Sequence, residues 1–596
     1  MNDNQTWSTT STFANEDRLP RVPLHSLEHS CERFLEWCAP LLTAAELATT
    51  RAAVEEFLKP DSPARVLHAD LERFNDTPGV RSWLDEFWPH RYLGRRDRIA
   101  LNANFFFLFR ESGESQLDRA AGLIAAALDH KAALEAETLP PVFQRGVPHT
   151  MAQNTFLFST TRIPGVPQDT ARVPYSAEWP GPSQARHIVV FFRGNAFRMD
   201  VRTDSGRPHD VADLVEGLRE VIKAGQEPAV DSPGHLTTKA RAEWAATRDR
   251  LLANPVNAAA LDTIETALFC VALEDFAPRG TLATCDALLY GNPENRWFDK
   301  SVTLIVYTDG QAGINIEHCG LDGTTILQFV DFLLSHTAHE QAVSEGSPAV
   351  TPIEFALDED QRAEVRAAAE SFDRFGRATA STVLSFSDFG TNRAKALGMS
   401  PDGFVQLAYQ LAHRRAKGRT GATYESIATR QFQGGRTEAM RVVTPEILRF
   451  VDLMDDPAAD RETRAAAFRA AAAKHVARAK ECQLGDAPEQ HLWELLMIQQ
   501  RRGAELGVTE PIALYETPGW KISRDDYLST SSAPSTSIQF FGFGSTSSQC
   551  IGVAYVLLPE AFNIYLSTPR PVEAGMLAFA QRLTEAIEQL QELLAG

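Results

Sequence analysis

The stretch 295–334, NRWFDKSVTLIVYTDGQAGINIEHCGLDGTTILQFVDFLL, constrains the fold of this chain more than any other. Its residues 301–307 and 312–317 form two short runs rich in β-branched side chains, a composition typical of strands. Asp309 and Gly310 lie between the runs and suit the positive φ angles of a tight turn. We therefore expect an antiparallel hairpin.

His318 directly follows the second of these strands, ahead of a glycine-containing loop and a helix capped by Asp322 or Thr324. A neutral imidazole is well suited to take a proton from a hydroxyl, and a carboxylate four residues later can orient it. The pattern H-x-x-x-D-G is short, however. The alternative is a histidine that only completes a strand end while Asp322 caps the helix.

The length and charge of the chain narrow its class. A chain of 596 residues predicts two domains or a pseudo-repeated pair. A net charge of -20 argues against nucleic-acid or anionic-membrane surfaces, because these need a basic stripe. No stretch approaches the ~20 apolar residues of a membrane span, and the first residues do not resemble a signal peptide. We expect a cytoplasmic protein.

Seven cysteines are spread widely along the chain without a C-x-x-C pair. Neither a disulfide framework nor a zinc site is indicated, and a reducing compartment fits this usage best. No metal site is expected.

Strands alternate with helices along the whole sequence, which predicts an α/β fold with mixed sheets. A second hairpin is expected over residues 186–201, around Gly194 and Asn195, and residues 257–273 have the apolar spacing of a helix. The Ser, Gly and Pro content of residues 343–352 is typical of a linker and marks the expected domain boundary.

Four sequence blocks occur in order, and together they carry a resemblance. They are NRWFDKS with EHCGLDG, SPDGFVQLAYQLAHRR, TYESIATRQFQGGRTEAMR, and LSTSS. With them the chain resembles the choline/carnitine O-acyltransferase family over nearly its whole length, as a divergent, bacterial-type member. H-x-x-x-D-G alone is shared with the wider chloramphenicol-acetyltransferase-like superfamily. The resemblance implies two similar domains, each a mixed sheet flanked by helices, with the reaction in a tunnel at their interface.

Four segments follow from this resemblance and the composition. Residues 1–18 are polar and expected to be disordered. Residues 19–80 are expected to be helices that pack on the C-terminal domain. An N-terminal acyltransferase domain with His318 would span residues 81–350, and a C-terminal domain with the donor- and acceptor-binding blocks would span residues 351–596.

The resemblance also assigns catalytic roles. His318 would be the general base that deprotonates an acceptor hydroxyl, which then attacks an acyl thioester without an acyl-enzyme, and Asp322 would orient it. The Ser-Thr-Ser block maps to Ser529, Thr530 and Ser531, of which Ser531 would donate to the developing oxyanion. Composition alone would make residues 529–537 a flexible polar loop.

The acceptor pocket departs from the family pattern. The tyrosine and threonine that hold the acceptor carboxylate are kept as Tyr424 and Thr437, and Ser529 and Thr530 are expected beside them. The arginine of the D-R-H-L block is replaced by Gln490, which cannot form the charged, bidentate clamp that arginine forms on a carboxylate. We therefore expect an acceptor other than carnitine.

Two phenylalanines are placed by the same resemblance. Phe543 aligns with the ring that packs on a quaternary ammonium group, although it could instead be a core aromatic. Phe541 falls where a glycine opens the acyl tunnel of long-chain relatives, so it predicts short or branched acyl groups. The two side chains would share one face of a strand.

The donor side departs as well. The first phosphate-binding lysine of an F-G-K triplet is replaced by Thr391, while Lys395 aligns with the second and Arg393 lies between them; solvated surface charge is the alternative for both. The other residues that the resemblance places at the donor are Asp402, Glu425 and Ser426. The family's D-G-Y-G loop is replaced over residues 549–552.

These features predict an O-acyltransferase that moves a short or branched acyl group from coenzyme A to a small hydroxyl acceptor. One alternative is a releasing acyltransferase of a natural-product pathway, which would take its acyl group from carrier-protein pantetheine. The other is an inactive binding or scaffold module of the same fold. No permanently bound cofactor, nucleic acid or membrane partner is expected, and the chain is expected to be a monomer.

Overall fold

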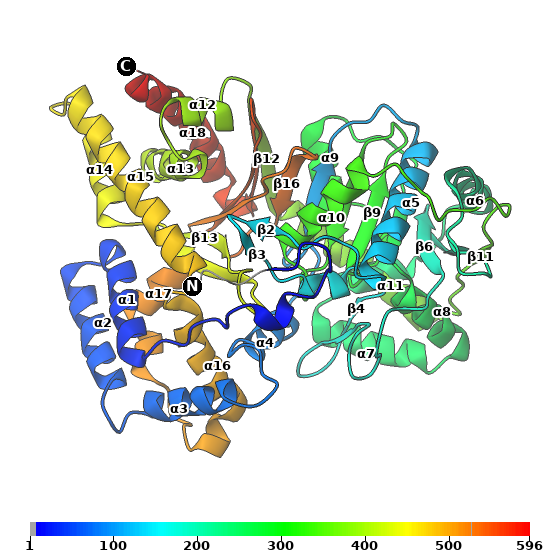
Figure 1. The fold of residues 1–596 in the computed structure, drawn as a ribbon, viewed down its shortest axis with the longest axis horizontal. Helices are drawn as coiled ribbons and strands as arrows, with labels where there is room; N and C mark the ends of the chain where they lie inside the picture. The colour runs from blue at the N-terminus through cyan, green and yellow to red at the C-terminus, as the bar shows by residue number, and fades with distance from the viewer. Residues whose placement is uncertain (1–6, 526, 596) are drawn as a thin grey trace. The chain divides into compact units, whose positions relative to one another are not determined.

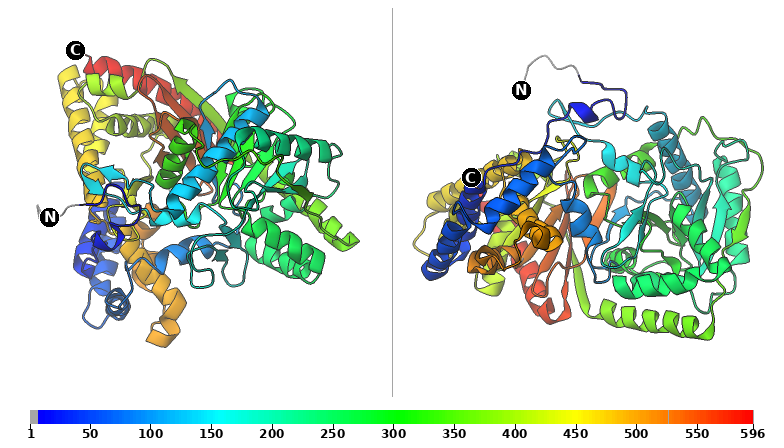
Figure 2. Two further views of the ribbon diagram at one scale, coloured as in Figure 1. Left: turned by 45° about the vertical axis from the view of Figure 1, so that its right-hand side comes forward. Right: turned by 90° about the horizontal axis from the view of Figure 1, so that it is seen from below.

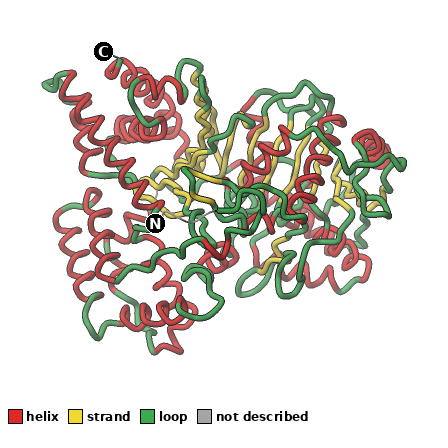
Figure 3. The backbone as a smooth tube through the Cα atoms, in the orientation of Figure 1, coloured by secondary structure: helices red, strands yellow, loops and turns green. Residues whose placement is uncertain are grey.

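The computed structural model describes residues 7–525 and 527–595 and divides into two compact units. Of the described residues, unit 1 contains 7–18, Pro89–Thr379 and Ser535–Gly544. Unit 2 contains Leu19–Trp88, Ala380–Pro534 and 545–595. Each unit is a mixed β-sheet flanked by helices, as expected for this α/β chain. Figures 1 to 3 show the course of the chain and the strands of each sheet.

The units differ from the expected segments at three places. The N-terminal helices belong with the C-terminal part of the chain, as expected, but the change of unit falls after Trp88 instead of residue 80. The internal boundary lies after Thr379 instead of residue 350, because residues 350–352 form an edge strand of the unit 1 sheet and the helix after them packs in the same unit. Residues 535–544 return to unit 1.

The unit 1 sheet has eight strands in the order β11-β7-β6-β8-β9-β10-β1-β16. β6 pairs in parallel with β8, and β8 pairs in parallel with β9. The other neighbouring strands of this sheet pair antiparallel. The strands are β1 (Phe105–Phe109), β6 (His187–Phe192), β7 (Asn195–Asp200), β8 (Cys270–Leu273), β9 (Val302–Val306), β10 (Ala312–Ile316), β11 (Val350–Pro352) and β16 (Ile538–Phe543). Two ribbons, β2 (Phe143–Gln144) with β3 (Val147–Pro148) and β4 (Thr161–Ile163) with β5 (Thr170–Arg172), lie outside the sheet.

Helices cover this sheet in two groups. α5 packs on both α6 and α10. Side chains of α7, α8 and α11 share a core with β6 and β8. The helices of unit 1 are α5 (Gln116–Glu135), α6 (Val211–Ala224), α7 (Arg241–Leu252), α8 (Pro255–Thr266), α9 (Thr281–Leu289), α10 (Gly323–Ser335) and α11 (Glu359–Arg377).

Both predicted hairpins are present. β9 and β10 pair through a turn in which Gly310 has φ +82°, and a Cβ there would also meet the Glu114 carbonyl oxygen at 2.0 Å. β6 and β7 pair through Arg193 and Gly194, both at positive φ. The predicted helix over residues 257–273 is wrong at its end, because residues 270–273 form β8. This strand is buried along its whole length, so it has the same unbroken apolar sequence as a buried helix.

The unit 2 sheet has six strands in the order β12-β18-β17-β15-β13-β14, with β15 parallel to both β13 and β17. The strands are β12 (Thr379–Phe386), β13 (Thr423–Ala428), β14 (Thr437–Arg441), β15 (Leu528–Ser532), β17 (Ile551–Leu557) and β18 (Phe562–Pro569). One face of this sheet packs with α13, α14, α15 and α18 around a large apolar core.

The N-terminal helices of unit 2 pack on α16 and α17. The helices of this unit are α1 (Leu27–Cys38), α2 (Ala44–Phe57), α3 (Pro63–Asn75), α12 (Thr391–Ala396), α13 (Pro401–Lys417), α14 (Pro445–Asp455), α15 (Arg461–Gln483), α16 (Glu489–Leu506), α17 (Pro518–Arg524) and α18 (Glu573–Leu594), and α4 (Phe87–Leu93) spans the change of unit.

The expected disorder of the first eighteen residues is wrong for residues 7–18, while residues 1–6 lie outside the described residues. The buried carboxylate of Glu16 accepts hydrogen bonds from Thr150 Oγ1 at 2.6 Å and from the Met151 backbone N–H at 2.5 Å. These hydrogen bonds help to hold residues 7–18 in place, although the polar composition of this segment predicted disorder. In the described part of the chain, no helix is long and apolar enough to cross a membrane.

Candidate active site

His318 lies between β10 and α10, in unit 1. Its Nδ1 is 2.6 Å from the Leu321 carbonyl oxygen and 3.6 Å from Asp322 Oδ1. Because a carbonyl oxygen only accepts, Nδ1 carries the proton of the neutral ring, and the lone pair lies on Nε2. The loop can turn this tightly because Gly320 packs on Phe156, where a Cβ would meet the ring at 2.2 Å. This tautomer is the one that a general base needs.

Asp322 is held by Gln153, which sequence reasoning did not identify. Gln153 Nε2 donates to Asp322 Oδ2 at 2.7 Å, and Gln153 Oε1 accepts from the Asp322 backbone N–H at 2.9 Å and from Thr325 Oγ1 at 2.8 Å. Asp322 occupies the N-cap position of α10, but its side chain makes no capping hydrogen bond. Its carboxylate instead lies between the amide of Gln153 and the imidazole of His318.

A buried ion-pair network supports the same loop through Glu317. Glu317 accepts from Arg162 Nη1 at 3.1 Å and from the Cys319 backbone N–H at 3.0 Å. Arg162 also donates through Nε to Asp169 Oδ2 at 2.6 Å. Burial works against the charge of Arg162, but Glu317 and Asp169 outweigh it and raise the pKa of the guanidinium above its ordinary value. Charge pairing therefore fixes the residue that precedes His318.

The network extends away from the loop through Asp169. Arg96 and Arg241 lie 2.9 and 2.6 Å from its carboxylate oxygens. Burial raises the pKa of Asp169, but Arg241 and Arg162 outweigh this effect and lower it. Arg241 also pairs with Asp299 at 2.8 Å, within the NRWFDKS block. Charged residues next to apolar strands, such as Asp299 and Glu317, were the available sequence signal for this network.

Aromatic rings surround the base in unit 1. The ring of His318 lies 4.9 Å from that of Tyr92 and 5.1 Å from that of Phe105. β1 places Phe105 opposite Phe543 of β16 and Phe107 opposite Phe541. The ring of Phe541 is 5.3 Å from that of Phe107 and 5.6 Å from that of Phe543.

The two predicted pocket phenylalanines therefore share one face of a strand, as expected. They belong to the unit that holds His318, and not to the C-terminal domain in which the sequence placed them. The apolar row that they form with β1 lies beside the base.

The remaining candidates lie in unit 2, several of them on one face of its sheet. Register places Tyr424 beside Ser529 in the parallel pair β13/β15 and beside Arg441 in the antiparallel pair β13/β14. Because side chains alternate along a strand, Ser426 and Ser531 lie on the same face as Tyr424 and Ser529. Ser531 is half-buried. The structure thus places two acceptor candidates, Tyr424 and Ser529, on one face together with Ser426, although Ser426 was predicted on the donor side.

Thr530 lies on the opposite, core-side face of this sheet. Its hydroxyl donates to the Tyr424 carbonyl oxygen at 2.8 Å and accepts from Gln406 Nε2 at 2.9 Å. Thr530 is fully buried, so both partners hold the strand and not a ligand. A residue that was predicted to bind the acceptor is placed to position Ser529 and Ser531 instead.

Gln490 is 1% exposed, and its amide donates to the Thr437 carbonyl oxygen at 2.5 Å. Gln490, which was predicted to stand in place of a family arginine, therefore holds the start of β14. Next to it, Glu489 pairs with Arg441 at 2.7 Å and with Arg524 at 3.1 Å. An internal carboxylate occupies the guanidinium fork of Arg441, the arginine that lies on the polar face beside Tyr424.

Two donor candidates lie in a buried cluster on the core-side face. Glu425 accepts from His475 Nε2 at 2.7 Å, and Tyr555 Oη donates to Asp402 Oδ1 at 2.5 Å. Burial, with a contribution from Asp402, raises the pKa of Glu425 to about 7. Burial opposes the charge of His475, but Glu425 outweighs it and raises the pKa of the imidazole. His475, in an alanine-rich helix, was not identified from the sequence.

Arg393 and Lys395 lie apart from this cluster on the short helix α12, and both are exposed. Arg393 Nε donates to Gln591 Oε1 of α18 at 2.9 Å. Their exposure agrees with the surface-charge alternative and leaves their donor role as a prediction.

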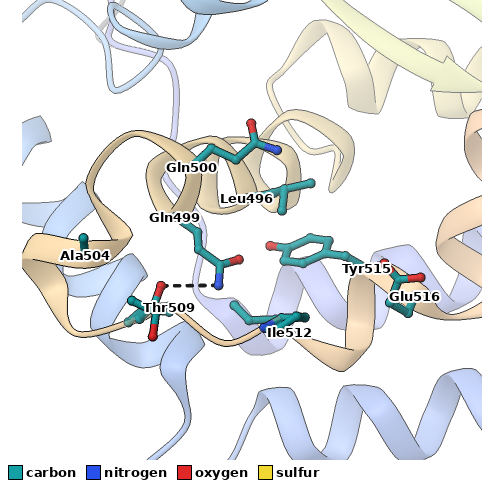
Figure 4. A pocket seen from close by; sticks show the side chains of 10 residues that line it. Leu496, Gln499, Gln500, Ala504, Thr509, Ile512, Tyr515 and Glu516 are labelled. Atoms are coloured by element: carbon teal, nitrogen blue, oxygen red, sulfur yellow. Dashed lines mark hydrogen bonds between the residues drawn. The ribbon is translucent and has the colours of Figure 1, made fainter.

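A hollow of about 440 Å³ in unit 2 lies beside α16, lined by Leu496, Gln499, Ile512 and Tyr515 among others. Figure 4 shows these side chains converging on it. No residue predicted to act in catalysis or binding lines it.

Comparison with known proteins places these features in context. Residues 22–585 match the family model described as choline/carnitine O-acyltransferase. Carnitine O-acetyltransferase from Rattus norvegicus is 28% identical over 600 residues, covering 98% of this chain and 94% of that protein. Peroxisomal carnitine O-octanoyltransferase from Rattus norvegicus is 32% identical over 529 residues, covering 85% of this chain and 84% of that protein. Mitochondrial carnitine O-palmitoyltransferase 2 from Mus musculus is 28% identical over 596 residues, covering 92% and 88%.

Proposed function

The chain belongs to the choline/carnitine O-acyltransferase family, and we propose that His318 is its general base and Ser531 the donor to its oxyanion. Members of this family are acyltransferases that use acyl-coenzyme A as a co-substrate, and this chain is such an enzyme. The proposal concerns which residues act and which acyl group and acceptor they serve.

The observation that carries the proposal is the tautomer of His318. With its Nδ1–H donated to Leu321, the imidazole can accept a proton only at Nε2. Nε2 takes the proton of the acceptor hydroxyl as the oxygen forms a bond to the thioester carbonyl carbon. When the tetrahedral intermediate collapses, the C–S bond breaks, and the same proton can pass to the leaving thiolate of coenzyme A. The base is then regenerated without a covalent enzyme intermediate.

Asp322 supports the imidazolium that forms during this transfer. Its carboxylate oxygen lies 3.6 Å from Nδ1, and Gln153 fixes the other oxygen. An opposite charge at this distance favours the protonated ring, and the fixed carboxylate keeps the ring from turning.

Ser531 supplies the hydroxyl for the oxyanion. It is half-buried on the polar face of β15, and the buried Thr530 beside it anchors the strand to β13 and α13. A positioned donor of this kind typically changes kcat by about 10²–10³-fold.

We further propose that the acceptor is a small alcohol without a carboxylate, such as a choline-like amino alcohol. The relatives named above act on carnitine, whose carboxylate requires a cationic clamp. Gln490 is neutral and buried, and Glu489 occupies the guanidinium fork of Arg441. A carboxylate on the acceptor would have to compete with Glu489, whereas an uncharged hydroxyl compound would not.

The acyl group in this proposal is short or branched. The rings of Phe541, Phe107 and Phe105 fill the face of the sheet beside His318, with centroid separations of 5.3–6.2 Å. A straight long chain would require these rings to move, whereas an acetyl or small branched group places little carbon beyond the carbonyl.

Coenzyme A is favoured over a carrier protein as the donor. Arg393 and Lys395 offer exposed positive charge for the phosphate groups of coenzyme A. The net charge of -20 would oppose the docking of an acidic carrier protein.

The test is thiol release from acetyl-, isobutyryl- and octanoyl-coenzyme A with carnitine, choline and uncharged amino alcohols as acceptors. We expect a short or branched donor and an acceptor without a carboxylate to give the highest kcat/KM. Gln490→Arg should raise the use of carnitine relative to choline, with Gln490→Lys as the matched control that adds charge without a planar fork. The acceptor proposal fails if carnitine is the best acceptor of the unaltered chain.

A further inference from the structure

Two histidine side chains of unit 1 converge on one carboxylate oxygen of Asp129. His336 Nε2 lies 3.0 Å and His339 Nδ1 lies 2.6 Å from Asp129 Oδ2. Potential ligand atoms of the three residues all lie within 4.8 Å of one another. Two imidazoles and a carboxylate directed at one point form a typical ligand set for a transition-metal ion.

The three residues come from two packed elements. Asp129 is in the third quarter of α5, and His336 is the C-cap residue of α10, with His339 in the irregular segment that follows. Figure 1 shows α10 beside α5, and the two helices are in direct contact. The Asp129, His336 and His339 side chains are 12%, 28% and 18% exposed. The site is therefore half-buried but reachable from solvent.

We propose that Asp129, His336 and His339 bind a divalent transition-metal ion of the Zn²⁺ class. Zinc takes imidazole nitrogen and carboxylate oxygen at about 2.0–2.2 Å, and a site with three protein ligands keeps a fourth position for water. Ligand atoms around such an ion lie about 3.3 Å apart, given those bond lengths and tetrahedral geometry. Each histidine nitrogen, now 3.0 and 2.6 Å from the Asp129 oxygen, would need to move away from it by less than about 1 Å to admit the ion. The spacing of the cysteines could not predict this site, because none of its ligands is a cysteine.

The electrostatics of this cluster differ from those of the two other such groups in the described part of the chain. In the group His25, His29 and Asp486, Arg33 Nε lies 3.6 Å from Asp486 Oδ1, and His25 Nε2 is bonded to the Gly485 carbonyl oxygen. In the group Asp402, Glu425 and His475, Asp402 Oδ1 accepts a hydrogen bond from the Tyr555 hydroxyl. Asp129 pairs with the two histidines and with no arginine or lysine among the described residues. Its charge is therefore available to a metal cation.

Metal binding requires a rearrangement of protons at both imidazoles. Each ring now presents an N–H to Asp129, so that proton must move to the other ring nitrogen or leave, and the freed lone pair then binds the metal. The bound ion would tie the C-terminal end of α10 to α5. The N-terminal end of α10 carries Asp322, so the site would stiffen the helix that supports the base loop.

The experiment is a zinc titration of the full chain after removal of metals with a chelator, followed by competition with a colorimetric zinc indicator. The variants are Asp129→Asn and His339→Asn, with His29→Asn as a matched control at another half-buried histidine–carboxylate pair. We expect one zinc ion that binds at least about tenfold more weakly in either site variant than in the unaltered chain, and unchanged in the control. Zinc should also raise the Tm of the unaltered chain and of the control, but not of Asp129→Asn, and Mg²⁺ should not replace it, because it prefers oxygen ligands.

The proposal is overturned if Asp129→Asn binds zinc as tightly as the unaltered chain, or if His29→Asn loses as much affinity as His339→Asn. Circular dichroism of the metal-free variants, compared with the metal-free parent, separates lost ligands from lost folding. If Asp129→Asn does not fold, His339→Asn alone decides the question, since it removes one imidazole from an irregular surface segment.

Discussion

Around His318 in unit 1, buried charges and the amide of Gln153 hold the base loop, whereas Tyr424, Ser426 and Ser531 of unit 2 are half-buried on one face of its sheet. Glu317, Arg162 and Asp169 are almost fully buried, and each has at least two charged or hydrogen-bonded partners. Along β13, by contrast, buried and half-buried residues alternate, and the half-buried ones, Tyr424 and Ser426, belong to the acceptor face.

This contrast indicates which positions can change substrate preference without loss of the fold. A buried network tolerates little substitution, because removing one member leaves another charge unpaired. Side chains on a half-buried face can change identity at little cost in stability. Tyr424, Ser426 and Ser531 belong to such a half-buried face, whereas Glu317, Arg162 and Asp169 belong to the buried network. The following predictions test this contrast, beginning with the largest expected effect.

Glu317→Ala should lower the free energy of unfolding by about 3–5 kcal/mol, because it leaves Arg162 buried with one carboxylate fewer. Glu114→Ala is the control, because it removes an exposed partner of Arg119 and should cost about 0–1 kcal/mol. Urea unfolding of both variants measures the difference. Equal, small losses would mean that the buried network does not hold the base loop.

Ser531→Ala should lower kcat by about 10²–10³-fold and leave KM nearly unchanged, since the hydroxyl acts on charge that develops in the transition state. Ser532→Ala is the matched control, because Ser532 is the next residue of β15 and is exposed. Steady-state kinetics with the preferred donor and acceptor decide the outcome. A comparable loss in both variants would remove Ser531 from the oxyanion role.

Phe541→Gly should raise the ratio of kcat/KM for octanoyl- over acetyl-coenzyme A by about tenfold or more, since methylene-sized differences in an apolar pocket change specificity on this scale. Phe541→Leu should give a smaller change in the same direction. If neither variant alters the ratio, the aromatic row beside His318 does not limit the acyl chain.

The smallest effect concerns pH. The pKa of Glu425 is raised from an ordinary value near 4.5 to about 7, so its protonated form stabilises the fold at low pH, and this stability is lost as the pH rises through about 7. The Tm of the unaltered chain should therefore fall from pH 5 to pH 8 more steeply than that of Glu425→Gln. Parallel curves would show that Glu425 does not titrate in this range.

The sequence predicted the parts of this molecule that depend on neighbouring residues. The hairpin β9/β10 follows from β-branched runs and a turn that requires Gly310, and His318 with Asp322 follows from the spacing of one loop. The support from Gln153 and Arg162 could not be predicted in this way, because these residues are more than 150 positions from the loop and join it only through tertiary packing.

The position of β16 in the unit 1 sheet could not be predicted for the same reason, because it depends on tertiary packing. Its sequence, IQFFGF, is apolar and aromatic like that of many strands, and nothing local specifies that it pairs with β1, more than 400 residues earlier. The buried positions of Gln490 and Thr530 were likewise not predictable, since polar residues are normally expected at the surface.

The central claim is that His318 removes the proton from the acceptor hydroxyl, and the most direct measurement is thiol release from acyl-coenzyme A by the unaltered chain, His318→Ala and His318→Gln. A positioned general base contributes about 10²–10⁴-fold, so both variants should lose turnover on this scale while circular dichroism and coenzyme A binding stay unchanged. Turnover of either variant within about tenfold of the unaltered chain would contradict the claim, because it would leave less than the smallest contribution expected of a general base.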